Sequence, residues 1–192
     1  MQNAIAQMVS ERFGGKRALL RLLASQWRHA LQRVGMAAPV RAGQVQRLVF
    51  VCKGNICRSP FGEGVARAIG VETCSFGLDA EPGVPCNPRA LETARARGID
   101  LAQHRATHID QYQPRSGDLV LCFDSEQLAV LQQRVGDRAL VQLLGQWHAP
   151  AMPYLHDPYG LSPAYFQACF ERIDSSVRAL AQQMPARAGA TT

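Results

Sequence analysis

The chain has 192 residues, of which 47% are hydrophobic and 19% are charged, a balance typical of one globular domain with a sizeable core. No apolar run approaches the roughly 18 residues of a membrane span. Six cysteines are scattered through a sequence without a secretory signal pattern, so we expect a reducing, cytoplasmic setting rather than a disulfide framework. The spacing of cysteines and histidines does not resemble a zinc site, and no metal ion is expected.

The net charge of +6 lies in the N-terminal part of the sequence. Residues 1–42 hold seven basic residues and one acidic residue, whereas the two signs cancel in the remainder. The basic character therefore describes an appendage over residues 1–42 and not the domain that we expect over residues 43–192. It gives no reason to expect a nucleic-acid partner for that domain.

Residues 16–34 have the apolar spacing of an amphipathic helix. The apolar face consists of Leu20, Leu23, Trp27, Ala30, Leu31 and Val34, and its basic flank consists of Arg17, Arg21 and Arg28. Such a helix packs on its own domain, stays a loosely ordered tail, or contacts an anionic membrane surface or a partner protein. The sequence leaves these alternatives open.

The residues after this helix carry stop and linker signals. Gly35 is expected to end the helix, and Pro39 with Gly43 indicates a linker. Met36 offers an alternative start of the chain, and the arginine-rich segment also has some character of a transit peptide.

Strands and helices are expected to alternate along the rest of the chain. The predicted strands span residues 45–51, 72–76, 118–123 and 139–143, and the predicted helices span residues 60–69, 88–97, 125–133 and 163–183. Long loops are expected over residues 77–88 and 145–160. The pattern predicts a three-layer α/β fold (αβα) with a small, about four-stranded parallel sheet and with ligands at the carboxyl ends of the strands.

The stretch from Leu48 to Pro60 is the expected functional centre. A strand leads to Cys52, a polar loop with Gly54 and Asn55 follows, and Arg58 opens a helix. Backbone N–H groups of such a loop and the helix dipole point at one spot and bind an anion. The arginine fork matches two phosphate oxygens, and the same dipoles and cation stabilise a thiolate on the floor of the loop. The structural alternative is an ordinary strand and turn with two core cysteines.

Four motifs in register point to one family. They are Val-Cys-Lys-Gly-Asn-Ile-Cys-Arg-Ser-Pro at 51–60, Asn87-Pro88-Arg89-Ala90, Leu121-Cys122-Phe123-Asp124 and His156-Asp157-Pro158-Tyr159. The first resembles the phosphate-binding loop of the low-molecular-weight protein tyrosine phosphatases, and the resemblance covers about residues 45–184. It implies a phosphotyrosine phosphatase that works through a phosphocysteine intermediate and without a cofactor.

The resemblance also implies catalytic roles. Cys52 would be the nucleophile, and Asp157, before a stiffening proline, would be the general acid. The phosphoryl oxygens would be held by Arg58 and by the backbone of Lys53, Gly54, Asn55, Ile56 and Cys57. Ser59 follows the arginine, where its hydroxyl reaches the sulfur; its alternative role is a helix cap.

Further residues are implied to support the site. His104 would buttress the loop, with a surface histidine as the alternative reading. Cys57 would form a reversible disulfide with Cys52 on oxidation, although a small packed side chain is an equal alternative. Asp124 is explained as the N-cap of a helix, and His156 is expected on the surface.

A few residues near the predicted site indicate which phosphorylated substrate the protein accepts. Ile56 stands where phosphotyrosine-specific members carry Ile, whereas arginine phosphatases resemble Cys-x-Gly-Asn-Thr-Cys-Arg. Tyr159 is expected to stack on the phenol at the mouth of the pocket. The loop over 77–83 and the stretch over 143–147 resemble bacterial members that act on tyrosine autokinases of capsule and exopolysaccharide export. A phosphotyrosine protein is therefore the expected partner, and the oligomeric state stays open.

Two other functions compete with this prediction. An arsenate reductase of the same fold needs two further cysteines to pass a disulfide outward, and Cys86 is alone in its loop. A non-catalytic phosphotyrosine-binding module, recruited by the basic helix, would not need nucleophile, arginine and acid together.

Overall fold

The computed structural model describes residues 2–32 and 44–184 of the chain. Its strands are β1 (Arg47–Cys52), β2 (Glu72–Gly77), β3 (Asp118–Cys122) and β4 (Leu140–Leu143). Its α-helices are α1 (Gln2–Phe13), α2 (Lys16–Gln32), α3 (Arg58–Ala68), α4 (Pro88–Arg95), α5 (Ser125–Val135) and α6 (Pro163–Ala181). Short 3-10 helices are η2 (Ile109–Gln111), η3 (Gly136–Arg138) and η4 (Leu144–Trp147). The predicted strands and helices are present, with ends that differ by a few residues.

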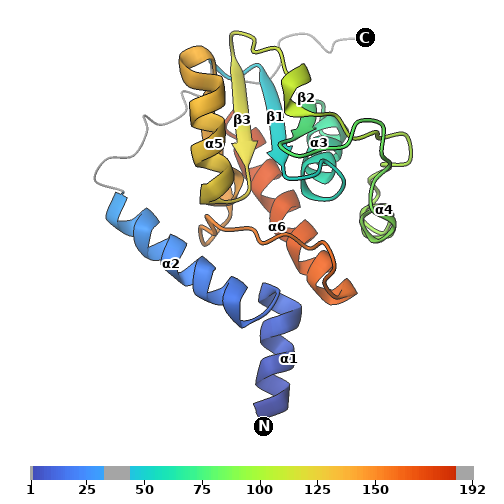
Figure 1. Cartoon of the computed structure of the whole chain (residues 1–192), viewed down its shortest axis with the longest axis vertical. Coiled ribbons are helices and arrows are strands. Elements are labelled where there is room, and N and C mark those ends of the chain that lie inside the picture. The colour runs from blue at the N-terminus through green and yellow to red at the C-terminus, as the bar shows by residue number, and fades with distance from the viewer. Residues whose placement is uncertain (1, 33–43, 185–192) are drawn as a thin grey trace.

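The four strands form one parallel sheet in the order β2-β1-β3-β4. Side chains of β1 alternate between two buried clusters, because successive residues of a strand point to opposite faces. Leu48 and Phe50 join the cluster that contains residues of α3 and α6, whereas Val49 and Val51 join the cluster that contains residues of α5. The predicted three-layer fold is thereby confirmed (Figure 1).

The helix starts follow from local capping chemistry. Asn87, Asp124 and Ser162 each accept a backbone N–H from the first turn of α4, α5 and α6 with their side chains. A proline occupies the first turn of α4 and α6, where its missing N–H costs no hydrogen bond. These signals place the helices after their strands, and the loops that lead into them lie at the carboxyl end of the sheet.

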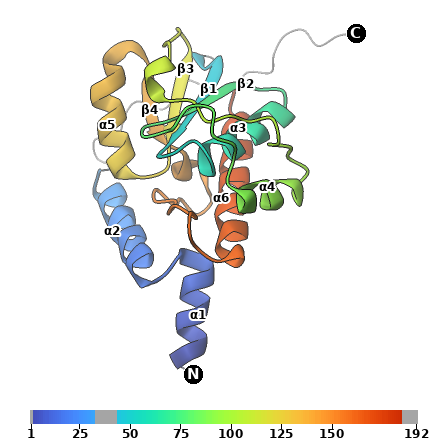
Figure 2. The same ribbon diagram turned by 45° about the vertical axis from the view of Figure 1, so that its right-hand side comes forward.

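The N-terminal segment forms two helices rather than the one predicted. Helix α1 was not predicted, although Ile5, Met8, Val9 and Phe13 follow helical spacing in its sequence. It packs against α6, with Arg172 over the ring of Phe13 and donating to the carbonyl of Arg12 at 2.6 Å. Gly14 and Gly15, both with positive φ, turn the chain into α2. Figure 2 shows both helices at one end of the molecule, with α1 next to the amino-terminal part of α6 and α2 running away from it toward α5.

The side of α2 that packs on the domain differs from the apolar face read from the sequence. Ala18 and Leu22 are buried, whereas Leu20, Leu23 and Trp27 are exposed. Leu20, Leu23 and Trp27, the members of the predicted face whose side chains the structure describes, are all exposed, whereas Ala18 and Leu22 make the contact. Helix α2 therefore packs on its own domain, which is one of the alternatives left open by the sequence. It does so through Ala18 and Leu22 and not through the predicted apolar face.

Several predictions about the N-terminal segment lie outside the described residues. These are the last two residues of the predicted helix, the stop at Gly35, the start at Met36, the linker signals Pro39 and Gly43, and the boundary between residues 42 and 43. Among residues 2–32 and 44–184, no helix combines the length and the apolar character needed to cross a bilayer.

Candidate active site

The loop over residues 53–57 joins the end of β1 to the start of α3. Carbonyls of Cys52, Lys53 and Ile56 accept hydrogen bonds from Leu78, Asp79 and Asn87 at 2.9, 2.8 and 2.9 Å. These bonds tie the outer side of the loop to the following segments. Within the described part of the chain, no amide of residues 53–57 donates a hydrogen bond to another group. The carbonyls are thus used for support, and the N–H groups remain available to an oxyanion.

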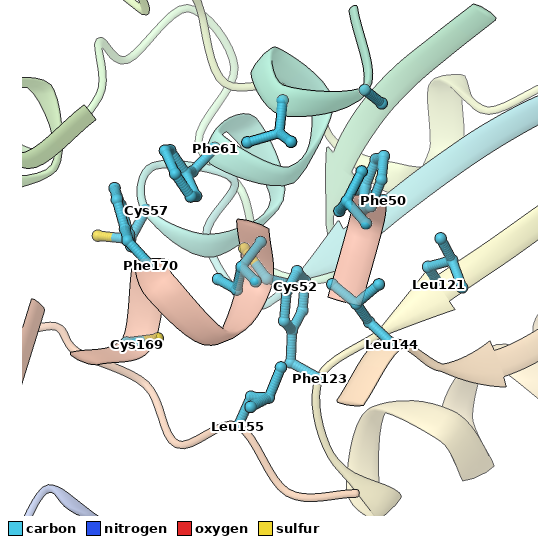
Figure 3. Packing of buried hydrophobic residues seen from close by; sticks show 14 of the residues in the cluster. Phe50, Cys52, Cys57, Phe61, Leu121, Phe123, Leu144, Leu155, Cys169 and Phe170 are labelled. Atoms are coloured by element: carbon cyan, nitrogen blue, oxygen red, sulfur yellow. The ribbon is translucent and has the colours of Figure 1, made fainter. Parts of the chain in front are cut away.

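Cys52 lies at the last position of β1 and belongs to the buried cluster that includes Phe123 and Leu155 (Figure 3). Its Sγ is 3.0 Å from the hydroxyl of Ser59, which lies inside the first turn of α3. The Ser59 hydroxyl accepts a hydrogen bond from Asn55 Nδ2 at 2.8 Å, and its single proton has two acceptors within reach, the carbonyl of Phe76 at 3.2 Å and the sulfur of Cys52. The alternative of Ser59 as a helix cap is wrong, because α3 already begins at Arg58.

Asn55 is the hub of the loop. It is fully buried and has φ +54°, a left-handed conformation that Asn tolerates better than most residues. Its Nδ2 also donates to Ser75 at 2.8 Å, and its Oδ1 accepts from the backbone of Thr107 at 2.8 Å. All three side-chain bonds hold the backbone turn that directs the neighbouring N–H groups inward.

His104 contacts the same residue from the outside of the loop. Its Nε2 lies 2.9 Å from the carbonyl oxygen of Asn55, and its side chain is 12% exposed. Burial lowers the pKa of His104, so the ring is neutral at pH 7 and donates through Nε2–H. Behind it, Ser75 donates to Glu63 at 2.5 Å. The alternative prediction, that His104 is a surface histidine, is wrong.

Arg58 is almost completely buried, with 2% exposure. Its Nη1 donates to the carbonyl of Leu155 at 3.0 Å, its Nη2 donates to the carboxylate of Asp157, and its guanidinium lies 5.4 Å from the ring centroid of Phe123. Burial alone would lower the pKa of Arg58, but Asp157 and Cys52 outweigh it and raise that pKa. The guanidinium therefore remains a fixed cation beside the sulfur.

Asp124 is a second carboxylate, after Asp157, that lies near the guanidinium of Arg58. Its Oδ1 caps α5 by accepting the N–H of Gln127 at 2.9 Å, and its Oδ2 is 3.6 Å from Arg58 Nη1. The capping role expected from the sequence is present, and the proximity to Arg58 is an addition that only the fold provides.

Asp157 is brought to the loop from the far end of the chain. Its side chain is 35% exposed, and its Oδ1 accepts the backbone N–H of Tyr159 at 3.1 Å. The Tyr159 side chain itself is 63% exposed, which leaves the ring accessible at this edge of the site. A partly exposed carboxyl next to the arginine is placed where a leaving oxygen would be protonated.

His156 is not the surface histidine that the sequence suggested. Its Nδ1 lies 2.7 Å from the hydroxyl of Tyr154, and its carbonyl accepts a bond from Tyr165 at 3.3 Å. Burial, followed by the charge of Arg58, lowers the pKa of His156. We call residues 148–162, the loop that carries Asp157, the acid loop. His156 is a packed part of this loop, because α6 and the turn at Gly14 lie against it.

The remaining loop residues differ in exposure. Lys53 is exposed, Gly54 and Ile56 are half-buried, and Cys57 is 3% exposed. Burial, and then the charge of Asp157, raise the pKa of the Cys57 thiol well above its ordinary value. All six cysteines carry free thiols in this structure.

Gly77 and Ser75 support the site and were missed from the sequence. Gly77 pairs with Cys52 in the register of β1 and β2, and a Cβ there would lie 2.7 Å from the carbonyl oxygen of Lys53 and 2.8 Å from the amide of Asn55. Only glycine fits that approach. Its place at the end of a strand, before a Gly/Pro-rich loop, was the available signal. Ser75 lies on a strand and had no such signal.

A family model and a curated relative both match this chain. The family described as low molecular weight phosphotyrosine protein phosphatase matches residues 47–188. A probable low molecular weight protein-tyrosine-phosphatase, EpsP of Ralstonia nicotianae, is 32% identical over 138 residues, which are 70% of this chain and 93% of EpsP.

Two solved structures share the fold. The tyrosine phosphatase amsI of Erwinia amylovora has a TM-score of 0.68 and 25% identity, covering 78% of this chain and all of amsI. The arginine phosphatase YwlE of Geobacillus stearothermophilus has a TM-score of 0.65 and 25% identity, covering 71% of this chain and 91% of YwlE. The fold alone therefore does not select the phosphorylated amino acid. By the family match and the identity to EpsP, this chain belongs to the low molecular weight phosphotyrosine protein phosphatase family and is a protein-tyrosine-phosphatase.

Proposed function

We propose that the chain hydrolyses phosphotyrosine in proteins in two steps through a phosphocysteine at Cys52. The observation that carries this proposal is the convergence of three groups: the Cys52 sulfur beside the Ser59 hydroxyl, the buried Arg58 cation, and Asp157 paired with that cation. A thiolate, a phosphate-binding fork and an acid are the parts that phosphoryl transfer through cysteine requires.

In the first step, the Cys52 thiolate attacks phosphorus and the bond from phosphorus to the phenolic oxygen breaks. Protonated Asp157 gives its proton to that oxygen, so that tyrosine leaves as a neutral phenol. Arg58 and the unbonded amides of residues 53–57 hold the equatorial oxygens. The incoming dianion competes with the Asp157 carboxylate for the guanidinium, which frees the carboxyl group for the leaving oxygen.

In the second step, Asp157 takes a proton from water, and the water oxygen attacks phosphorus. The sulfur–phosphorus bond breaks, and Ser59 donates to the departing sulfur from 3.0 Å. Inorganic phosphate leaves, Cys52 is again a thiolate and Asp157 is again protonated, so the cycle balances with one water consumed.

We further propose tyrosine rather than arginine as the phosphorylated residue. The half-buried Ile56 offers an apolar contact to a phenol, and the exposed Tyr159 ring follows Asp157 by two residues. The physiological substrate we propose is a bacterial tyrosine autokinase or a related protein of capsule or exopolysaccharide export, in line with the motifs of the 77–83 and 143–147 stretches. The free thiols support a reducing, cytoplasmic compartment.

The test compares turnover of a phosphotyrosine peptide and a phosphoarginine peptide by the wild type, Cys52→Ser and the matched control Cys74→Ser. We expect tyrosine-selective turnover that Cys52→Ser abolishes and Cys74→Ser retains. Rapid acid quenching should recover phosphate on the peptide that contains Cys52. Turnover without phosphate on that peptide, or preference for phosphoarginine, would contradict the mechanism or the substrate, respectively.

Arsenate reduction receives no support from the cysteines outside the loop. Cys86 is 3% exposed, and burial raises the pKa of its thiol to about 12, which disfavours it as an attacking thiolate. An arsenate-dependent loss of two free thiols would revive that function. A pure phosphotyrosine-binding module would bind the peptide without any phosphate release.

A further inference from the structure

The outward side of α2 is the feature that the phosphatase chemistry leaves unexplained. Ala18 and Leu22 hold the helix on the domain with 3% and 5% exposure, and Gln26 donates to the carbonyl of Ala151 at 3.4 Å. Trp27 follows Ala18 by nine residues, about two and a half helical turns, and so lies on the opposite side. The face of α2 that packs on the domain therefore consists of two apolar residues and the polar Gln26. The opposite, second face of the helix makes no such contact in the described part of the chain and is exposed.

That second face is apolar and strongly exposed. Leu20, Leu23 and Trp27 have exposures of 65%, 45% and 70% and follow one another at helical spacing. Single exposed apolar residues are ordinary, whereas a contiguous set marks a contact surface. Of the eight large hydrophobic side chains that are exposed in the described part of the chain, five lie on α1 and α2. Leu23 also lines a groove of about 990 Å³ between these helices and α6, which extends the apolar surface.

The charged residues of α2 itself are all positive. Lys16 and Arg17 are exposed at its start, and the sequence of α2 contains no acidic residue. Two copies of such a face would repel each other across a symmetric interface, whereas an anionic surface would attract it. A single convex helix with tryptophan, leucine and basic residues fits the interface of a lipid bilayer, which needs no groove to receive it.

We propose that the face formed by Lys16, Arg17, Leu20, Leu23 and Trp27 docks the phosphatase on an anionic lipid surface. The leucines and the indole enter the headgroup region, and the two cations contact lipid phosphates. Because the opposite face of α2 remains packed on the domain, docking holds the catalytic domain at the membrane without a spanning helix. The proposal is independent of the phosphorylated residue that the active site accepts.

The experiment uses the full chain with Trp147→Phe, which leaves Trp27 as the only tryptophan. Vesicles of phosphatidylglycerol mixed with phosphatidylcholine are compared with vesicles of pure phosphatidylcholine. We expect co-sedimentation and a blue shift of Trp27 emission with the anionic vesicles only, and weakening of both with salt. Lys16→Glu/Arg17→Glu should weaken binding by about 25-fold or more, since each basic residue near the surface contributes roughly fivefold.

A second pair of variants tests the apolar part in the chain with its native Trp147. Leu20→Ser/Leu23→Ser/Trp27→Ser should lose co-sedimentation, whereas the matched control Val130→Ser/Leu140→Ser, which alters exposed apolar residues of α5 and β4, should retain it. Both should keep the rate on p-nitrophenyl phosphate, which verifies folding. Absence of binding, equal binding to neutral vesicles, or equal loss in the control would overturn the proposal. A blue shift that follows protein concentration without lipid would assign the face to self-association instead.

Discussion

Arg58 donates a hydrogen bond to the carboxylate of Asp157, a residue 99 positions away in the sequence. This contact joins the cation that would hold a phosphoryl group to the carboxyl group that would protonate the leaving oxygen. In the absence of a substrate the two charges neutralise each other, with Arg58 buried and Asp157 partly exposed. A bound phosphate must take over the guanidinium, so the affinity for oxyanions and the state of the acid are coupled.

Asp157→Asn is expected to change catalysis and phosphate binding in opposite directions. The rate kcat should fall by roughly 10²–10⁴-fold, because the proton donor is lost. The inhibition constant of inorganic phosphate should decrease, because the competing carboxylate no longer occupies Arg58. Steady-state kinetics with p-nitrophenyl phosphate and added phosphate measure both. Asp137→Asn, at an exposed position of η3, is the control. Weaker phosphate binding by the Asp157 variant would argue that the ion pair assists binding.

Two substitutions of Asn55 separate the effect of its left-handed backbone conformation from the effect of its side-chain hydrogen bonds. Asn55→Gly retains the positive φ but removes the bonds to Ser59, Ser75 and Thr107, and Asn55→Ala adds a left-handed strain of about 1–2 kcal/mol. Both variants should lose most activity, and each should be destabilised by about 1–3 kcal/mol from unpaired buried groups. Urea unfolding should then find the Ala variant less stable than the Gly variant. Equal stabilities would mean that the backbone conformation at this position is unstrained.

Gly14 and Gly15 provide a matched pair for the contact between the N-terminal helices and the acid loop. Both have positive φ, at 78° and 107°. A Cβ at Gly14 would lie 2.7 Å from His156 Cδ2, whereas a Cβ at Gly15 would meet nothing within 4 Å. Gly14→Ala should therefore lower kcat by an order of magnitude or so, since a shift of about 1 Å costs up to roughly a hundredfold. Gly15→Ala should leave kcat unchanged, and equal rates in the two variants would uncouple the extension from the site.

The two buried histidines make stability depend on pH. Burial lowers the pKa of His104 and of His156 below the ordinary value of 6.5. The unfolded chain therefore binds more protons than the folded chain just below pH 6.5. The stabilisation is complete above that value and is lost as pH falls through the folded pKa values. Urea unfolding at pH 7.5 and 5.5 should show this loss, and His104→Gln should reduce the difference. A pH-independent free energy of unfolding would contradict the burial of both rings.

Local patterns were sufficient for the sheet, the domain helices and the phosphate loop. The apolar run before Cys52, the caps at Asn87 and Asp124, and the prolines at two helix starts each act within a few residues, so the sequence shows them directly. The parallel direction of the strands follows from their alternation with helices, whereas their order β2-β1-β3-β4 is known only from the structure. The family resemblance then named Cys52, Arg58 and Asp157 as site residues, and the fold brings these three together.

The contacts between distant segments were decided only by the tertiary structure. Nothing near Ser75 indicates that it supports Asn55, and the strand end at Gly77 indicates a turn but does not reveal that the phosphate loop packs against this glycine. The packing of α2 was likewise decided by the tertiary structure, because Ala18 and Leu22 dock on the domain while Leu20, Leu23 and Trp27 are exposed. Periodicity reports which residues share a side of a helix, but which side is buried depends on the shape and chemistry of the surface it meets. That surface is assembled from the acid loop and α6, more than a hundred residues away in the chain.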